Sequence, residues 1–347
     1  MNTRADTPTQ QESGSHNPGA LIVVIAVPVI FAITLLTFAW PAARLQPRDL
    51  PLGLAGPAQA TQPIEQRLAQ QPDAYSVHRY ADEQAARNAI ENRDVYGAIV
   101  ASATGVKLLT ASAASPVFAG MIERSFATPQ IEAGLKAAKQ PLPQIEDVVP
   151  ADTDDPRGSV LSSLVLPLVL SSVITAVLLT LKGRPGRLEA AALVVAASLG
   201  GIVGIAMVQS WLSAFGGPWL VNAGVLCLTM LAIAATLTGL SSLMGHAGLA
   251  LGGLTMVLVA NPWSGISSAP ELLPQPIGLI GQLLPPGAGV NLLRSTAYFD
   301  GNGGDWHLAV LFGWAAFGFS AIYAGALLQR RRAEAPQGLE PALPGAG

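Results

Sequence analysis

Between Glu189 and Glu271 the sequence runs for 81 residues without an aspartate, glutamate, lysine or arginine. A soluble protein brings charged residues to its surface at helix ends and loops, so a gap of this size does not fit a soluble core. A bilayer selects such segments, because a helix that crosses it needs about 20 apolar residues. The gap therefore predicts several membrane-spanning helices in succession.

Three further stretches lack charged residues: residues 13–43, 158–181 and 306–329. Each is at least 24 residues long, which is enough for one helix to cross a bilayer. Over the whole chain 12% of the residues are charged and 50% are hydrophobic, whereas about a quarter of an ordinary soluble chain is charged. The net charge of −3 also argues against a nucleic-acid partner, which would need a basic surface.

Turn residues divide the longest gap into separate helices. Gly216-Gly217-Pro218 ends one apolar segment, polar residues around His246 end the next, and Asn261-Pro262 ends a third. The sequence thus predicts an all-α membrane fold with six transmembrane helices. The predicted spans are about 20–42, 159–181, 189–210, 219–241, 246–261 and 307–328, with disordered cytoplasmic tails at 1–19 and 330–347.

Basic residues in short connections predict the orientation of a membrane protein. Three basic residues lie within 182–187, and residues 330–332 are three arginines, whereas the connection 262–306 holds a single basic residue, Arg294. We therefore expect both termini in the cytoplasm, and the connections 43–157 and 262–306 outside. The first apolar segment exceeds the roughly 7–15 residues of a signal peptide, so we expect an uncleaved anchor.

Residues 43–157 have an ordinary soluble composition and predict an extracellular α/β domain inserted between the first two spans. The predicted strands are 75–80, 95–101 and 106–110, and the predicted helices are 82–92 and 115–138. Asp82 is suited to cap the first of these helices. Residues 139–157 are rich in proline and acidic side chains, and we expect an extended, solvated linker there.

Short apolar runs broken by proline and glycine mark the connection 262–306. They favour outer re-entrant half-helices sheltered by protein, and an ordinary loop with packed leucines is the alternative. Arg294 follows one of these runs, and Glu271 is the other charged residue between Glu189 and Asp300. A charge beside apolar segments is costly unless it is paired or reaches water. Arg294 therefore either pins the segment, with Glu271 as its candidate partner, or faces water and head groups.

Glycines four residues apart recur on two predicted spans: Gly200 with Gly204, and Gly248 with Gly252. Such pairs let helix backbones approach closely, either within one chain or between chains. The chain contains 36 glycines, so chance spacing is the alternative.

Sequence motifs for catalysis and cofactor binding are missing from the chain. No phosphate-binding loop of the type Gly-x-x-x-x-Gly-Lys-Ser/Thr occurs, and the four histidines lack metal-ligand spacing. The one cysteine, Cys227, has no partner for a disulfide within the chain. We therefore expect no enzyme activity, no metal and no cofactor in this chain.

The order of elements and two local stretches are typical of one family of membrane proteins. The order is one helix, a large insertion and five helices. Within the insertion a helix at 82–92 precedes the strand Gly97-Ala98-Ile99-Val100, and residues 261–294 form a proline-rich loop before the last helix. Asp155-Pro156-Arg157-Gly158 leads into the second span. In these features the chain resembles bacterial ABC-2-type transporter permeases of the phage-infection-protein-like (Pip-like) branch, which carry a large extracellular domain.

The resemblance implies a permease subunit of an exporter in the bacterial cytoplasmic membrane, with a hydrophobic or amphiphilic substrate. It also implies a second permease chain, identical or related, and a separate ATP-binding subunit. Residues 1–19 depart from the family's pattern, because they lack the amphipathic helix that usually precedes the first span. The alternative function is a non-transporting scaffold or receptor whose outer domain is anchored in the envelope.

Overall fold

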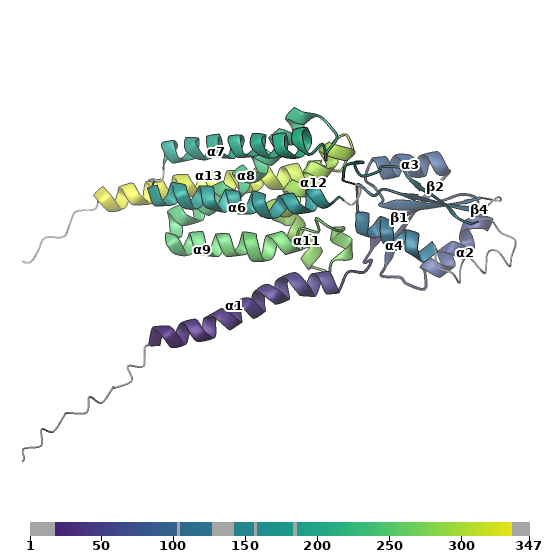
Figure 1. The fold of residues 1–347 in the computed structure, drawn as a ribbon, viewed down its shortest axis with the longest axis horizontal. Helices are drawn as coiled ribbons and strands as arrows, with labels where there is room; N and C mark the ends of the chain where they lie inside the picture. Colours follow the sequence, from purple (N-terminus) through teal and green to yellow (C-terminus); the bar gives the residue numbers. More distant parts are fainter. Residues whose placement is uncertain (1–17, 103–104, 127–141, 156–157, 183–185, 335–347) are drawn as a thin grey trace, which may run out of the picture.

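The computed structural model describes residues 18–102, 105–126, 142–155, 158–182 and 186–334. These residues form a bundle of long helices with a smaller α/β domain at one end of the bundle (Figure 1). Most of the two tails expected to be disordered lies outside the described residues. The last helix continues to Glu334, so it includes the three arginines that had been placed in the C-terminal tail.

Five helices are long and apolar enough to cross a membrane. They are α1 (Pro18–Ala43), α6 (Ser159–Lys182), α7 (Arg187–Ile205) with its π-helical continuation η1 (Ala206–Trp211), α8 (Trp219–Met244) and α13 (Asp305–Glu334). Each of them contains one of the predicted spans.

The sixth predicted span, 246–261, is not among these five. Its residues are helical but divided into α9 (His246–Leu254), a π-helical turn η2 (Thr255–Ala260) and the short α10 (Asn261–Trp263). A sixth membrane crossing therefore stays a prediction.

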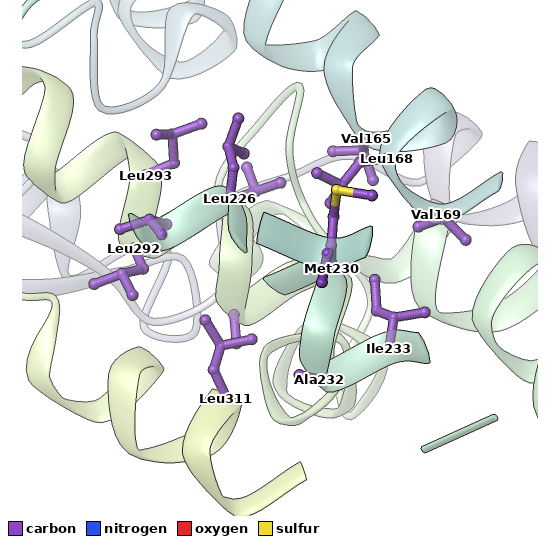
Figure 2. Packing of buried hydrophobic residues seen from close by; sticks show 14 of the residues in the cluster. Val165, Leu168, Val169, Leu226, Met230, Ala232, Ile233, Leu292, Leu293 and Leu311 are labelled. Carbon is purple, nitrogen blue, oxygen red and sulfur yellow. The ribbon is translucent and has the colours of Figure 1, made fainter. Parts of the chain in front are cut away.

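Helix α8 is the centre of the bundle. Helices α6, α7, α9, α12 (Pro285–Tyr298) and α13 all pack against it. Figure 2 shows the resulting core, in which Val165 and Val169 of α6, Met230 and Ile233 of α8 and Leu311 of α13 come together. Helix α1, by contrast, lies apart from the bundle along most of its length (Figure 1). From Val24 onward it exposes nearly all of its apolar side chains.

The α/β domain is built on a five-stranded sheet with the order β2-β1-β3-β4-β5. The strands are β1 (Leu50–Ala55), β2 (Tyr75–Tyr80), β3 (Gly97–Ser102), β4 (Gly105–Thr110) and β5 (Gln144–Asp147), and the helices are α2 (Ala58–Leu68), α3 (Glu83–Glu91) and α4 (Pro116–Phe126). The β3–β4 pair is antiparallel and the other three pairs are parallel. Helix α3 covers one face of the sheet, and α2 and α4 cover the other.

Successive side chains of a strand point to opposite faces of the sheet, which explains this packing on both faces. Leu52 and Leu54 of β1 point toward α2 and α4, whereas Ala55 and Ala98 face α3. The predicted strands at 75–80, 95–101 and 106–110 correspond to β2, β3 and β4.

One sequence interpretation of this region was wrong, and one strand was missed. Residues 144–147 are not linker but edge strand β5, which pairs with β4. Strand β1, which lies in the middle of the parallel part, was not predicted, because its proline and glycine conceal the strand pattern of LPLGLA. The predicted helix at 115–138 is described only as far as Phe126, and the rest lies outside the described residues.

Candidate functional site

The connection 262–306 folds into a set of short helices where the bundle meets the α/β domain (Figure 1). They are the 3-10 turn η3 (Pro270–Leu272), α11 (Ile277–Leu283) and α12. Prolines at the first positions of α12 fit a helix start, where a backbone N–H is not needed. All side chains of α12 from Pro285 to Ala297 are buried, so it is an internal element rather than an exposed loop.

This connection is embedded in both hydrophobic cores of the α/β domain. Phe299, which follows α12, packs in the core beneath α3. Ala269 and Leu272 pack in the core on the opposite face, with the leucines of β1. The backbone oxygen of Leu272 also accepts hydrogen bonds from the Gln46 amide at 3.1 Å and from Arg48 Nη1 at 2.8 Å. The domain is therefore attached to the bundle by packing on both faces of its sheet.

Arg294 lies at the centre of this junction and is 2% exposed. Its Nη1 donates to Asn291 Oδ1 at 2.9 Å, and its Nη2 donates to the backbone oxygen of Ile266 at 2.7 Å. Asn291 in turn donates to Gln282, which donates to the backbone oxygen of Ser264. Arg294 thus joins α12 to the start of the connection through side-chain and backbone oxygens.

A second arginine enters the same network from the α/β domain. Arg93, in a left-handed conformation just after α3, donates from Nη1 to the backbone oxygen of Asn291 at 3.1 Å and to Ser295 Oγ. Its Nη2 lies 3.3 Å from Asn291 Oδ1, the atom that Arg294 also contacts. The guanidinium also stacks on Phe299, 5.3 Å from the ring centroid. Two guanidinium groups therefore converge on one neutral amide oxygen.

The predicted pairing of Arg294 with Glu271 is wrong. Glu271 Oε2 accepts a hydrogen bond from Tyr96 at 2.8 Å, and no residue described by the structure forms a salt bridge with Arg294 or Arg93. The alternative, in which Arg294 faces water, is wrong as well, because the side chain is buried. The sequence alone could not show that Tyr96, which leads into β3, would place its hydroxyl beside the Glu271 carboxylate.

Burial determines the protonation of these groups. Loss of solvent raises the pKa of Tyr96, and the nearby Glu271 carboxylate raises it further, so the phenol remains a donor. Burial, together with the positive charge of Arg93, lowers the pKa of Arg294 to about 10. Arg294 therefore keeps its charge at neutral pH, although no carboxylate balances it within the described residues.

A cavity of about 570 Å³ opens beside this network. Its polar lining includes Arg93, Tyr96, Glu271, Gln282 and Asn291. The remaining lining residues are Asp49, Val95, Ala114, Pro270, Gln275, Leu279, Gly303, Trp306 and His307. The volume lies within the range of about 300–1,000 Å³ that small-molecule sites occupy.

The four predicted glycines lie away from this cavity, at helix contacts within the chain. A Cβ at Gly200 or Gly204 of α7 would meet side chains of α8, and one at Gly252 of α9 would meet Leu237 and Leu240 of α8. A Cβ at Gly248 would collide with the backbone of α8 at Leu240. Two glycines that the spacing pattern missed also face backbone: Gly201 faces the backbone of Cys227, and Gly318 faces the backbone of Ala235.

Four residues of the junction were not predicted from the sequence: Arg93, Tyr96, Gln282 and Asn291. Arg93 and its contact Asn291 are separated by 198 positions, so local spacing carries no sign of the pair. The sequence offered one sign of a buried polar network: Asn291 and Arg294 are polar residues within an otherwise apolar run.

Comparison with known proteins gives one match. Residues 18–179 match the model of a family described as ABC-2 family transporter protein. The match covers α1, the described part of the α/β domain and nearly all of α6, a little under half of the chain. No curated protein and no solved structure matches the chain. The five apolar helices and the match together indicate a multi-pass membrane protein whose residues 18–179 are similar to an ABC-2 family transporter protein.

Proposed function

We propose that the chain is the permease subunit of an ABC-2-type exporter in a bacterial cytoplasmic membrane. The observation that carries the proposal is the family match over α1, the α/β domain and α6. The remaining helices support it, because α7, α8 and α13 continue the same bundle with apolar, membrane-length segments. The finer assignment to the Pip-like branch rests on the resemblance of the inserted domain and of the loop before the last helix.

The distribution of basic residues supports an orientation with the α/β domain outside. Arg187 begins α7, and Arg330 and Arg331 lie in the last turns of α13. Both helix ends point away from the α/β domain (Figure 1). Because basic residues are retained on the cytoplasmic side, the domain and the junction with its cavity would face the exterior.

Energy for transport would come from another chain. The sequence contains no phosphate-binding loop, so a separate ATP-binding subunit would hydrolyse ATP, and this chain would need no cofactor of its own. A second permease chain, identical or related, would complete the path. The nearly unpacked α1 is an apolar surface that lipid or this second chain would cover. The substrate would be hydrophobic or amphiphilic.

Purification and efflux together test this proposal. The tagged chain, expressed in its native host, should co-purify in mild detergent with an ATP-binding subunit and with a second permease chain. Everted vesicles containing the complex should accumulate hydrophobic dyes only when ATP is supplied. A monomer without an ATP-binding subunit, in vesicles that show no ATP-dependent uptake, would contradict the proposal and favour a scaffold or receptor.

A further inference from the structure

The junction contains two guanidinium groups and no carboxylate bound to either within the described residues. Arg93 and Arg294 share Asn291 Oδ1 at 3.3 Å and 2.9 Å, and the proximity of Arg93 disfavours the charge of Arg294. The Nε of Arg294 is buried and has no hydrogen-bond partner. Buried cations in proteins are normally paired. This arrangement is therefore short of an anion.

Donors remain available on the cavity side of the pair. A guanidinium carries five N–H donors, and Arg93, which lines the cavity, uses three contacts in the junction. Gln275 and Gln282 in the same wall each use one amide N–H within the chain and keep a second, whereas both N–H groups of Asn291 are engaged. An anion in the cavity would meet a charged donor and would lie near the second, buried guanidinium.

Two acidic residues in the same cavity wall restrict the kind of ligand that can carry the anion. Glu271 has its Oε2 engaged by Tyr96, and Asp49 is exposed at the edge of the domain. A bare anion would be repelled by both carboxylates. A head group that carries hydroxyl or amine donors beside its phosphate or carboxylate would satisfy the acidic and the basic side chains together.

The rim of the cavity is apolar. Leu279 of α11 is 59% exposed and Trp306, at the start of α13, is 60% exposed. Beside Leu279, Ile280 and Leu283 are exposed on the same short helix. A tryptophan at the first turn of a membrane-length helix is typical of the membrane–water interface. The opening of the cavity is thus suited to the apolar part of a ligand that lies in a leaflet.

We propose that this cavity binds an amphiphile by its head group, which carries a phosphate or carboxylate together with hydroxyl or amine donors. The anion contacts Arg93, the donors face Glu271, and the apolar tail leaves past Leu279 and Trp306. This inference goes beyond the proposed transport function, because the site would bind a resident lipid as well as a transported amphiphile.

Calorimetric titration of the full-length protein in a neutral maltoside tests the site. Dihexanoylphosphatidylglycerol, which carries phosphate and hydroxyls, should bind saturably with one molecule per chain. Dihexanoylphosphatidylcholine, which has no donors, and glycerol 3-phosphate, which has no tail, should each bind at least about tenfold more weakly. Equal binding of glycerol 3-phosphate would show a site for free anions, and equal binding of the choline lipid would show unspecific apolar binding. Either result would overturn the proposal.

Substitution of Asn291 separates ligand binding from folding. Asn291→Asp would place a carboxylate between the two guanidinium groups and remove the donor to Gln282, so its unfolding temperature reports the net of these two changes, and lipid binding should weaken by about tenfold or more. A purely structural network predicts a changed unfolding temperature with unchanged binding. Retention of wild-type affinity in Asn291→Asp would therefore contradict the anion site.

Charges at the rim give a second test that leaves the buried network intact. Leu279→Glu should weaken binding of the phosphatidylglycerol lipid, and Leu279→Lys should strengthen it, each by about threefold to tenfold at low salt. Leu142→Glu, at an exposed position of the α/β domain outside the cavity lining, is the matched control. Equal affinities for both Leu279 variants would exclude an anion at this cavity.

Discussion

Arg294 shows how one buried side chain connects segments that the chain separates. It holds Ile266, at the start of the connection, against Asn291 in α12. Because both acceptors are neutral oxygens, the arginine works through the reach and planar shape of its guanidinium rather than through ion pairing. A lysine ammonium lacks this planar fork and would match the two acceptors less well.

Replacement of Arg294 should therefore destabilise the protein. Arg294→Ala removes the donor to the buried Ile266 oxygen, leaves Asn291 Oδ1 with only the longer contact from Arg93 and creates a cavity, so the free energy of unfolding should fall by about 3 kcal/mol. Arg294→Lys should recover part of this loss. Thermal unfolding in detergent measures both variants. Arg79→Ala, which removes an exposed salt bridge with Glu65, is the control and should change stability by less than about 1 kcal/mol; an equally small effect of Arg294→Ala would show that the junction is not held by this residue.

An exposed ion-pair cluster on the α/β domain predicts a dependence of stability on pH. Hydrogen bonds from Arg87 and Lys107 lower the pKa of Glu146 from 4.5 to about 2. Because the folded-state pKa is the lower one, the stabilisation is present above pH 4.5 and is lost as the pH falls toward 2. The unfolding temperatures of the wild type and of Glu146→Gln should therefore differ at pH 6 and approach each other as the pH falls to about 2. A difference that stays constant over this range would show that Glu146 does not act through its charge.

At the scale of the elements, the long helices were predictable and their lateral packing was not. Runs without charge mark α1, α6, α7, α8 and α13 within a few residues, since desolvation forbids charges there. The face that each helix turns to its neighbours was concealed, because these helices are apolar all round. For the same reason, the search for glycines four residues apart found Gly200 and Gly204 but not Gly318, where the backbones of α8 and α13 meet.

The contacts of the junction were harder to predict from the sequence than the packing of the helices. Arg294 and Glu271 were recognised as costly charges, and both lie in the junction. Their partners, Asn291 and Tyr96, follow from the docking of a sheet domain onto the bundle, which no local pattern encodes. Strand β1 was missed for a related reason: its pairing with β2 and β3 compensates for a proline and a glycine that argue against a strand.

The contact between α8 and α13 predicts a strong effect of small substitutions on one helix face. Gly318→Ala would force a methyl group into the backbone of Ala235, so it should lower stability by about 2 kcal/mol or more. Gly313→Ala, on the same helix, meets nothing within 4 Å and should leave stability unchanged or slightly higher. Thermal unfolding of the two variants side by side measures this. Equal effects would show that α13 does not pack on α8 through Gly318.

At the scale of the whole molecule, the fold separates two environments. Apolar helices fill one end, and a sheet domain of ordinary polarity fills the other (Figure 1). Between them lies the polar junction, with the partly buried Arg93 in the wall of its cavity and exposed apolar residues at its rim. Such a boundary is expected where a membrane surface meets water. The proposed orientation follows from the basic residues at the far end of the bundle.

Cysteine labelling in intact cells tests the membrane orientation on which the proposed function depends. In a Cys227→Ser background, Gln71→Cys places a thiol on the exposed surface of the α/β domain, and Gln329→Cys places one at the opposite end of the bundle. A membrane-impermeant maleimide should label the cysteine at position 71 at once and the cysteine at position 329 only after the cells are permeabilised. Labelling of position 329 but not of position 71 in intact cells would contradict an exporter subunit whose sheet domain and head-group cavity face outward.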